Sequence, residues 1–168
     1  MDVIEAIKTR RSIRSYKKDP VPEEALRQIL EAGRWAPSAS NMQPWEFITF
    51  TNPEIKQRVM RCFLYGSFLE EAPLGIMVVA DPKIGDADCL MQDGTLATYA
   101  IMLAAHGLGL GTCWIHPGLN DEKAKEILGI PKEKKIICAL SVGYPNETPT
   151  KERRKLADIV HAERYGNR

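Results

Sequence analysis

Two stretches of the sequence decide its fold, GIMVVA at residues 75–80 and MQDGTLATYAIMLAAHGL at residues 91–108. The first is a short, continuous apolar run between turn-forming residues, which predicts a strand that is buried on both faces. The second lacks a wide polar side, which predicts a helix that is central in the fold or covered by another subunit. A sheet packed against this helix is therefore the expected centre of the molecule.

Other segments alternate between helical and strand patterns around this centre. Capping residues and apolar spacing predict four more helices, which start at Asp2, Pro22, Asn52 and Asn120. Aromatic and β-branched residues predict three more strands, at residues 45–51, 112–115 and 136–142. No repeat or linker divides the chain. We therefore expect a single domain over residues 1–168, of mixed α/β type, with one sheet covered by helices.

The composition is that of an ordinary globular protein, with 44% hydrophobic and 27% charged residues in a chain of 168. This mixture excludes disorder throughout the chain. The formal net charge is +1, from 23 basic and 22 acidic residues, which argues against a general nucleic-acid binder or a polybasic membrane protein. No apolar run approaches the roughly 18 residues that a membrane helix needs, and the start of the chain lacks the apolar core of a secretory signal.

The cysteines and histidines are not spaced like metal ligands or a catalytic triad. Cys62, Cys89, Cys113 and Cys138 lie far apart and form no CxxC pair. We therefore expect free, mostly buried thiols and no metal site. Free thiols favour a reducing cytoplasm as the location of the protein. The three histidines share no ligand or triad spacing, so we expect no nucleophilic triad.

A basic cluster, RRSIR at residues 10–14, lies in a stretch from Lys8 to Lys18 that holds six basic residues and no acidic one. If the first helix ends near Thr9, the arginines lie at its C-terminal end, where they stabilise the helix dipole. The same guanidinium groups and serine hydroxyl also suit phosphate oxygens, which they would bind through charge-assisted hydrogen bonds. The spacing alone leaves both interpretations open.

A polar loop, PSASNMQPW at residues 37–45, follows the second predicted helix. Such a loop can be an ordinary turn whose serine and asparagine side chains bond their own backbone. This one carries five hydrogen-bonding side chains between two stiffening prolines, which suits a heterocycle rich in amide and carbonyl groups. Further along, GLGLG at residues 107–111 has GxGxG spacing and follows a helix. We interpret it as a helix stop with close backbone packing, not as a dinucleotide-binding motif.

Five motifs occur in order along nearly the whole chain: RRSIRSY at 10–16, PSASNMQPW at 37–45, GLGLGTCW at 107–114, VGYP at 142–145 and RRKLADIV at 153–160. Together they closely resemble the nitroreductase-like family of FMN-dependent oxidoreductases. The resemblance implies an α+β, three-layer sandwich with a central mixed, antiparallel-rich sheet flanked by helices. It also implies an intertwined homodimer with FMN at the interface. Electrons would pass from NADH or NADPH, in a ping-pong cycle, to an acceptor such as a nitroaromatic or a quinone.

The resemblance also implies which residues bind FMN. Arg10 and Ser12, helped by Arg11, match residues that hold the phosphate and the ribityl chain. Arg14 matches the basic residue at the pyrimidine edge, where a fixed cation stabilises the negative charge of the reduced flavin and raises its reduction potential. The other matched residues are Pro37, Ser38, Ser40, Asn41 and Gln43 around the isoalloxazine, in part from the partner subunit, the backbone of Cys113, Trp114 and Ile115 past the flavin ring, and Arg153 at the phosphate, with Arg154 adjacent to it.

The resemblance assigns no catalytic acid, base or nucleophile to the protein, because FMN itself accepts and donates the hydride. One alternative is a flavin-binding protein without turnover, serving as a sensor or store. Another is a small RNA binder that uses residues 8–18, which the near-zero net charge disfavours. A flavin-consuming reaction is a third, less favoured in so short a chain. The physiological acceptor and the choice between NADH and NADPH stay open.

Overall fold

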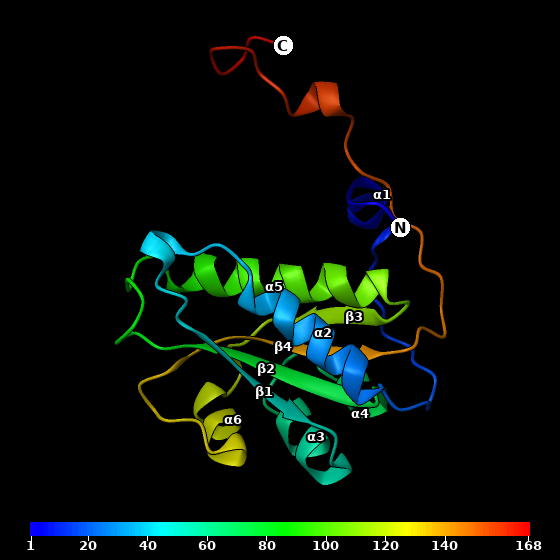
Figure 1. The fold of residues 1–168 in the computed structure, drawn as a ribbon, viewed down its shortest axis with the longest axis vertical. Coiled ribbons are helices and arrows are strands. Elements are labelled where there is room, and N and C mark those ends of the chain that lie inside the picture. Colours follow the sequence, from blue (N-terminus) through cyan, green and yellow to red (C-terminus); the bar gives the residue numbers. More distant parts are fainter.

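The strand predicted at residues 75–80 is confirmed as β2 (Leu74–Ala80), whose residues are all buried. In the computed structural model, which describes residues 1–168, β2 lies between β1 (Trp45–Phe50) and β4 (Lys135–Gly143). β3 (Gly111–Ile115) pairs with the other edge of β4, so the strand order is β1-β2-β4-β3 (Figure 1). All three strand pairs are antiparallel.

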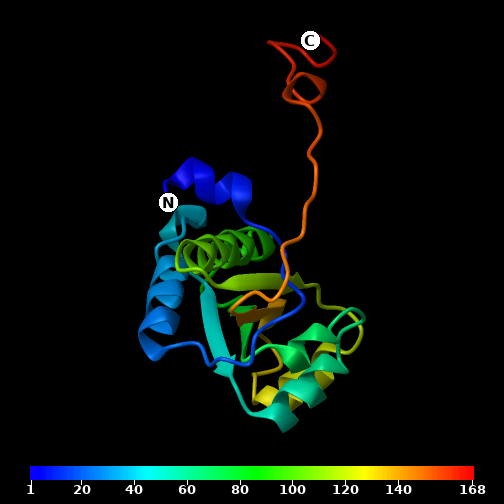
Figure 2. The same ribbon diagram turned by 90° about the vertical axis from the view of Figure 1, so that its right-hand side faces the viewer.

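Helices cover both faces of this sheet and complete a three-layer sandwich (Figures 1 and 2). On one face lie α2 (Glu23–Arg34) and α5 (Leu90–Gly107), and on the other lie α3 (Pro53–Met60), α4 (Phe68–Glu71) and α6 (Asp121–Leu128). The even-numbered residues of β2 pack with α2 and α5, and its odd-numbered apolar residues pack with the other three helices. Burial on both faces therefore explains the continuous apolar run of this strand.

The predicted helix starts are confirmed at their capping residues. The side chains of Asp2, Asn52 and Asn120 accept hydrogen bonds from amides in the first turns of α1 (Val3–Thr9), α3 and α6. Each bond satisfies an amide that has no partner inside its helix. Three short elements are not predicted, since three or four residues show no helical period: α4, η1 (Ala39–Asn41) and η2 (Leu156–Asp158). None of the helices is both long enough and apolar enough to traverse a membrane.

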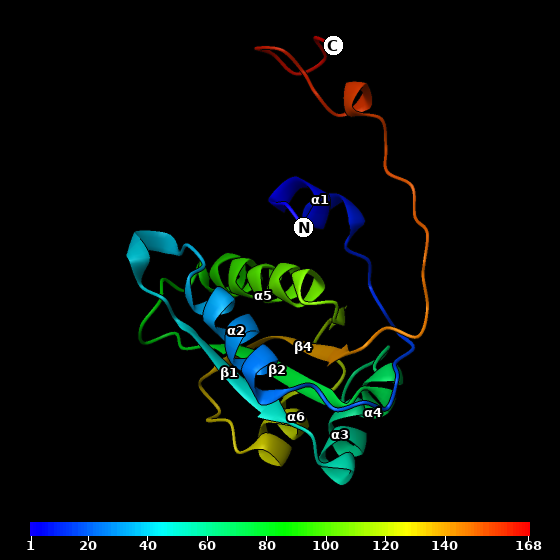
Figure 3. The ribbon, with the colours of Figure 1, turned by 45° about the vertical axis from the view of Figure 1, so that its right-hand side comes forward.

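The helix α1 and the C-terminal tail (residues 148–168) stand apart from the three layers (Figures 1 and 3). α1 buries none of its residues, and its apolar stripe is open, with 71% of Val3 and 60% of Ile4 exposed. The tail extends away from the sandwich and exposes its apolar side chains as well (Figure 2). A periodic stripe predicts that a helix has an apolar face, but it does not say which chain covers that face.

Candidate cofactor-binding site

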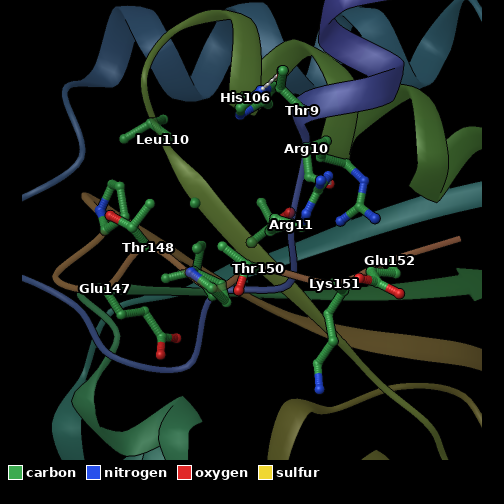
Figure 4. A pocket seen from close by; sticks show the side chains of 15 residues that line it. Thr9, Arg10, Arg11, His106, Leu110, Glu147, Thr148, Thr150, Lys151 and Glu152 are labelled. Carbon is green, nitrogen blue, oxygen red and sulfur yellow. Dashed lines mark hydrogen bonds between the residues drawn. The ribbon is translucent and has the colours of Figure 1, made fainter.

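A cleft of about 740 Å³ lies beside the edge strand β3, where the end of α1 and the start of the tail approach each other (Figure 4). Arg10 and Arg11 line it from the segment that follows α1, and His106 lines it from the end of α5. The first two residues of β3 also line it, as do residues 147–152, where the tail begins. Segments from the beginning, the middle and the end of the chain thus meet at one cleft.

The segment after α1 is fixed directly against β3. Ser12 forms an isolated parallel bridge with Thr112, and the Ile13 amide donates to the Thr112 carbonyl at 3.0 Å. This bridge lies outside the four strands, so the sheet, which was expected to be mixed, is entirely antiparallel. Gly111 permits this approach, because an added Cβ would lie only 2.6 Å from Cγ1 of Ile13. The interpretation of GLGLG as a helix stop followed by close backbone packing is therefore confirmed.

Arg10 lines the cleft, and its positive group is unpaired. Its guanidinium nitrogen Nη1 is buried and has no hydrogen-bond partner. Burial, followed by the charges of Arg153 and Arg11, lowers the pKa of Arg10. A buried donor left without a partner costs roughly 1–3 kcal/mol, and more when the group is charged. An anion in the cleft would remove this penalty, so the donor fits the phosphate group of FMN.

Arg11 behaves differently from Arg10. Its Nη1 donates to the carbonyl oxygens of Lys8 at 2.7 Å and of Arg10 at 2.9 Å. These carbonyls lie at the end of α1, where the last carbonyls of a helix have no amide partner within it. The helix-end interpretation of the basic cluster therefore describes Arg11, whereas the phosphate interpretation stays a prediction for Arg10, which lines the cleft without a partner. Residues 8–18 do not form a continuous free basic arm of the kind that the RNA-binding alternative needs.

Arg14 and Arg153 do not line the cleft. Arg14 is exposed, and its guanidinium carbon lies 5.7 Å from the centroid of the Phe68 ring. Arg153 is exposed on the tail, although its charge adds to burial in lowering the pKa of Arg10. Both adjacent arginines donate to backbone carbonyls of the tail, Arg153 to Glu152 at 3.1 Å and Arg154 to Asp158 at 2.9 Å. Since of these two only the charge of Arg153 acts on Arg10, Arg153 is the better candidate for a second phosphate ligand.

The flavin-facing segment predicted in β3 lies at an open edge of the sheet. Cys113, Trp114 and Ile115 continue β3 beyond the cleft-lining residues and pair only with β4. Burial raises the pKa of the Cys113 thiol, which keeps this thiol protonated and unreactive. An edge strand leaves backbone donors and acceptors unpaired on its outer side. The geometry therefore suits backbone contacts to a ligand, and not contacts through the side chain of Cys113.

The polar loop at residues 37–43 lies at the opposite end of α5 from the cleft (Figure 1). Its Ala39 amide bonds Asp93 near the start of α5, whereas His106 near the end of that helix lines the cleft. The helical rise between these two positions is about 20 Å. One chain alone therefore does not bring Pro37, Ser38, Ser40, Asn41 and Gln43 around the cleft that contains Arg10.

The backbone of this loop is held in a strained shape. Ser40, Asn41 and Gln43 have left-handed φ angles of 48°, 56° and 52°, a conformation that costs a non-glycine residue roughly 1–2 kcal/mol. Such residues persist where the surroundings fix them, and they cluster at functional sites. Within the loop, Ser38 Oγ accepts the Gln43 amide at 2.9 Å. Among side chains outside the loop, only that of Asp93 bonds the loop backbone, and its Oδ1 accepts from the Ala39 amide at 3.0 Å.

Asp93 and His106 are candidates that sequence analysis misses. Asp93 is buried, and its second oxygen, Oδ2, has no partner. A lone acid in the otherwise apolar stretch 91–108 is the signal that could have identified it. His106 carries no such signal, because a single histidine beside apolar residues is usually structural. Only the folded chain brings it to the same cleft as Arg10.

Replacing Asp93 by alanine is expected to loosen the loop at residues 37–43, because the strained backbone loses its outside anchor. A hydrogen bond to a charged group contributes about 1.5–3 kcal/mol, so amide hydrogen exchange in the loop should accelerate about tenfold or more. Asp93→Asn keeps an acceptor oxygen and should have a smaller effect. Exchange rates in the alanine variant equal to those of the parent would contradict the anchoring role.

The fold and the cleft together define an α+β protein with a site suited to an anion beside its edge strand. The model of the nitroreductase family matches residues 7–64 and 56–144, so the chain belongs to this family. A Methanothermobacter thermautotrophicus protein, provisionally named NADH dehydrogenase/NAD(P)H nitroreductase, is 38% identical over 98% of this chain and 88% of its own. The FMN reductase (NAD(P)H) of Bacillus subtilis is 31% identical over 99% of this chain and 75% of its own. The solved FMN-dependent nitroreductase from Clostridium difficile R20291 is 34% identical, and the match covers 97% of this chain and 100% of that one, with a TM-score of 0.85.

Proposed function

We propose that this chain is an FMN-dependent NAD(P)H oxidoreductase that passes electrons to an electrophilic acceptor such as a nitroaromatic or a quinone. The observation that carries the proposal is the buried, unpaired Nη1 of Arg10 in a cleft bounded by β3. Family membership supports it, as do relatives named for FMN and NAD(P)H. Residues 1–168 form a single FMN-binding domain, and its four free cysteines fit a reducing cytoplasm.

The phosphate end of FMN is assigned to the cleft. Arg10 and Ser12 hold the phosphate and the ribityl chain, Arg11 fixes the end of α1 beside them, and Arg153 adds a second positive charge. When bound, FMN supplies the redox chemistry by accepting a hydride from NAD(P)H and transferring it to the acceptor. The residues of the chain bind and orient the cofactor, and Arg14 supplies a fixed positive charge toward its pyrimidine edge.

A second copy of the chain completes the ring end of the site. The polar loop at residues 37–43 lies about 20 Å along α5 from the cleft-lining end of that helix. Pairing of two copies brings the loop of one chain toward the cleft of its partner. The outer edge of β3, at Cys113, Trp114 and Ile115, then provides backbone contacts past the ring. Each FMN thus contacts both chains of a homodimer.

Three exposed apolar surfaces support this homodimer. They are the stripe of α1 with Val3 and Ile4, the outer side of α5 with Leu96 and Tyr99, and the apolar side chains of the tail. Separate exposed apolar side chains are common, but three surfaces on one side of a small protein indicate an interface. Covering α5 with a second copy also explains why this helix lacks a wide polar side.

Anaerobic mixing tests the proposed activity. The purified protein, loaded with FMN, is mixed with NADH or NADPH, and absorbance near the visible flavin band is followed. Bleaching by a reduced nicotinamide, then rapid recovery on adding a nitroarene or a quinone, is the expected result. A protein that binds FMN but is not bleached by either nucleotide would instead be a flavin store or sensor. A protein that binds no FMN would refute the proposal.

Arg14→Ala is expected to lower the midpoint potential of bound FMN while leaving most of the binding intact. A positive charge a few ångströms from a solvent-exposed negative one contributes about 1 kcal/mol, which corresponds to roughly 20 mV for a two-electron couple. Redox titration against indicator dyes measures the shift. Arg14→Lys keeps the charge and should retain most of the potential. An unchanged midpoint potential in the alanine variant would show that Arg14 does not lie at the pyrimidine edge of the flavin.

A further inference from the structure

His106 occupies a defined hydrogen-bonded position in the lining of the cleft (Figure 4). Its Nε2 lies 2.8 Å from Oγ1 of Thr9. The hydroxyl of Thr9 donates its only proton to the carbonyl of Glu5, at 2.7 Å. Nε2 of His106 must therefore carry a proton and donate it to Thr9. The other ring nitrogen, Nδ1, makes no hydrogen bond within the protein.

The surroundings of His106 keep the ring neutral. Burial is the main cause that lowers its pKa, and the charges of Arg10 and Arg11 lower it further, while Glu5 acts in the opposite direction. Residues 147–152 contribute both signs of charge to the cleft, with Lys151 against two glutamates, Glu147 and Glu152. Near pH 7, Nδ1 is therefore an unprotonated acceptor, and the charges of Arg10 and Arg11 act more strongly on the ring than that of Glu5.

We propose that His106 takes up a proton at Nδ1 when the phosphate group of FMN enters the cleft, and so becomes a further cation of the phosphate site. This inference rests on the proposed function. The proton comes from solvent, and Nε2 keeps its own proton in the bond to Thr9. A phosphate dianion reverses the local balance of charge, because it pairs with Arg10 and attracts a second cation. FMN binding is then coupled to proton uptake.

The direction of the coupling follows from the sign of the charges. The phosphate raises the pKa of His106. FMN therefore binds more tightly as the pH falls from the pKa of His106 in the FMN-bound protein to its pKa in the free protein. The phosphate of free FMN has its own second pKa, near about 6. Arginines favour its dianion, so this group releases a proton on binding. The two effects have opposite signs, and near pH 7 the release is small.

Counting protons in the unmutated protein tests the inference. FMN is titrated calorimetrically into the apoprotein at pH 7, in several phosphate-free buffers of different ionisation enthalpy. The dependence of the observed heat on that enthalpy gives the number of protons exchanged. We expect net uptake with FMN and none with riboflavin, which lacks the phosphate. A count of zero or a net release with FMN would overturn the inference.

The variant His106→Gln tests the same coupling by affinity. Glutamine keeps a donor for Thr9 but does not titrate. An opposite charge that shifts a pKa by about one unit changes affinity by up to tenfold. We therefore expect the ratio of variant to parent Kd for FMN to rise several-fold between pH 8 and pH 6. His161→Gln, at the far end of the tail, should leave the ratio near one.

The outcomes separate this inference from the proposed function. If the parent binds FMN with the same pH dependence as His106→Gln, the proton coupling is refuted while the oxidoreductase proposal stands. If the parent binds no FMN at any pH, the proposed function fails and the coupling fails with it. If His106→Gln does not fold, the proton count in the unmutated protein still decides the question.

Discussion

Replacing Arg10 by alanine is expected to weaken FMN binding by roughly ten- to a hundredfold, the largest effect of any single substitution at the cleft. A charge-assisted hydrogen bond contributes about 1.5–3 kcal/mol, and each 1.4 kcal/mol corresponds to about a factor of ten in Kd. The unpaired Nη1 of Arg10 is already buried in the cleft. The variant therefore loses a preformed donor, and not a flexible surface charge that water could replace.

Fluorescence titration with FMN and with riboflavin measures this effect and identifies its origin. Because the contact is to the phosphate, the affinity for riboflavin should be nearly the same in variant and parent. Arg154→Ala is the matched control, since of the two adjacent arginines only Arg153 lowers the pKa of Arg10. Arg153→Ala should weaken FMN binding by an intermediate factor. Equal losses for FMN and riboflavin in the Arg10 variant would show general damage to the fold and contradict the phosphate role.

Ending the chain after Arg154 is expected to convert the proposed homodimer into monomers. The residues removed include Leu156, Ile159 and Val160, all exposed in the single chain, with 72% of Leu156 open to solvent. Burying one such side chain stabilises an interface by about 1.5–3 kcal/mol. Two tails together therefore supply several kcal/mol, and their loss should raise the dimer Kd by at least about a thousandfold. Keeping Arg153 and Arg154 separates this effect from loss of phosphate ligands.

Sedimentation velocity over a range of protein concentrations measures the change in mass. The full-length variant Leu156→Ser/Ile159→Ser should dissociate partly, because it removes apolar area but keeps the length of the tail. Lys155→Ser alters a neighbouring exposed polar residue and should stay dimeric. A truncated chain that sediments as a dimer would mean that α1 and α5 are sufficient to hold the two copies together.

Local sequence signals predicted most of the elements correctly. β2 could be predicted because an uninterrupted apolar run of that length suits a strand covered on both faces, and helices cover both of its faces. The helix starts were equally predictable, because the side chains of Asp2, Asn52 and Asn120 accept hydrogen bonds from amides in the first turns of the helices that follow them. For the caps, the deciding interaction lies within a few residues of the signal, whereas for β2 the local composition already indicates burial on both faces.

The site was less predictable, because its geometry depends on residues far apart in the chain. Arg10, predicted as a phosphate ligand, lines the cleft, but the sequence did not show that Arg11 caps α1 while Arg10 is left unpaired. The left-handed backbone of Ser40 depends on a contact between its loop and α5, which no local pattern encodes. The resemblance named the segments expected to bind FMN, whereas their division between two ends of α5 appears only in the folded chain.

The route of the tail has a consequence for handling the protein. Residues 147–152 line the cleft, and the chain then runs without interruption into a segment that extends away from its own sandwich. A partner that binds that segment therefore also fixes residues 147–152, which form one wall of the cleft. Dilution that separates the two copies should therefore loosen the wall and release flavin. The yellow colour per mole of polypeptide should then fade on dilution more steeply than a one-to-one equilibrium allows, and concentrated stocks should keep their colour longest.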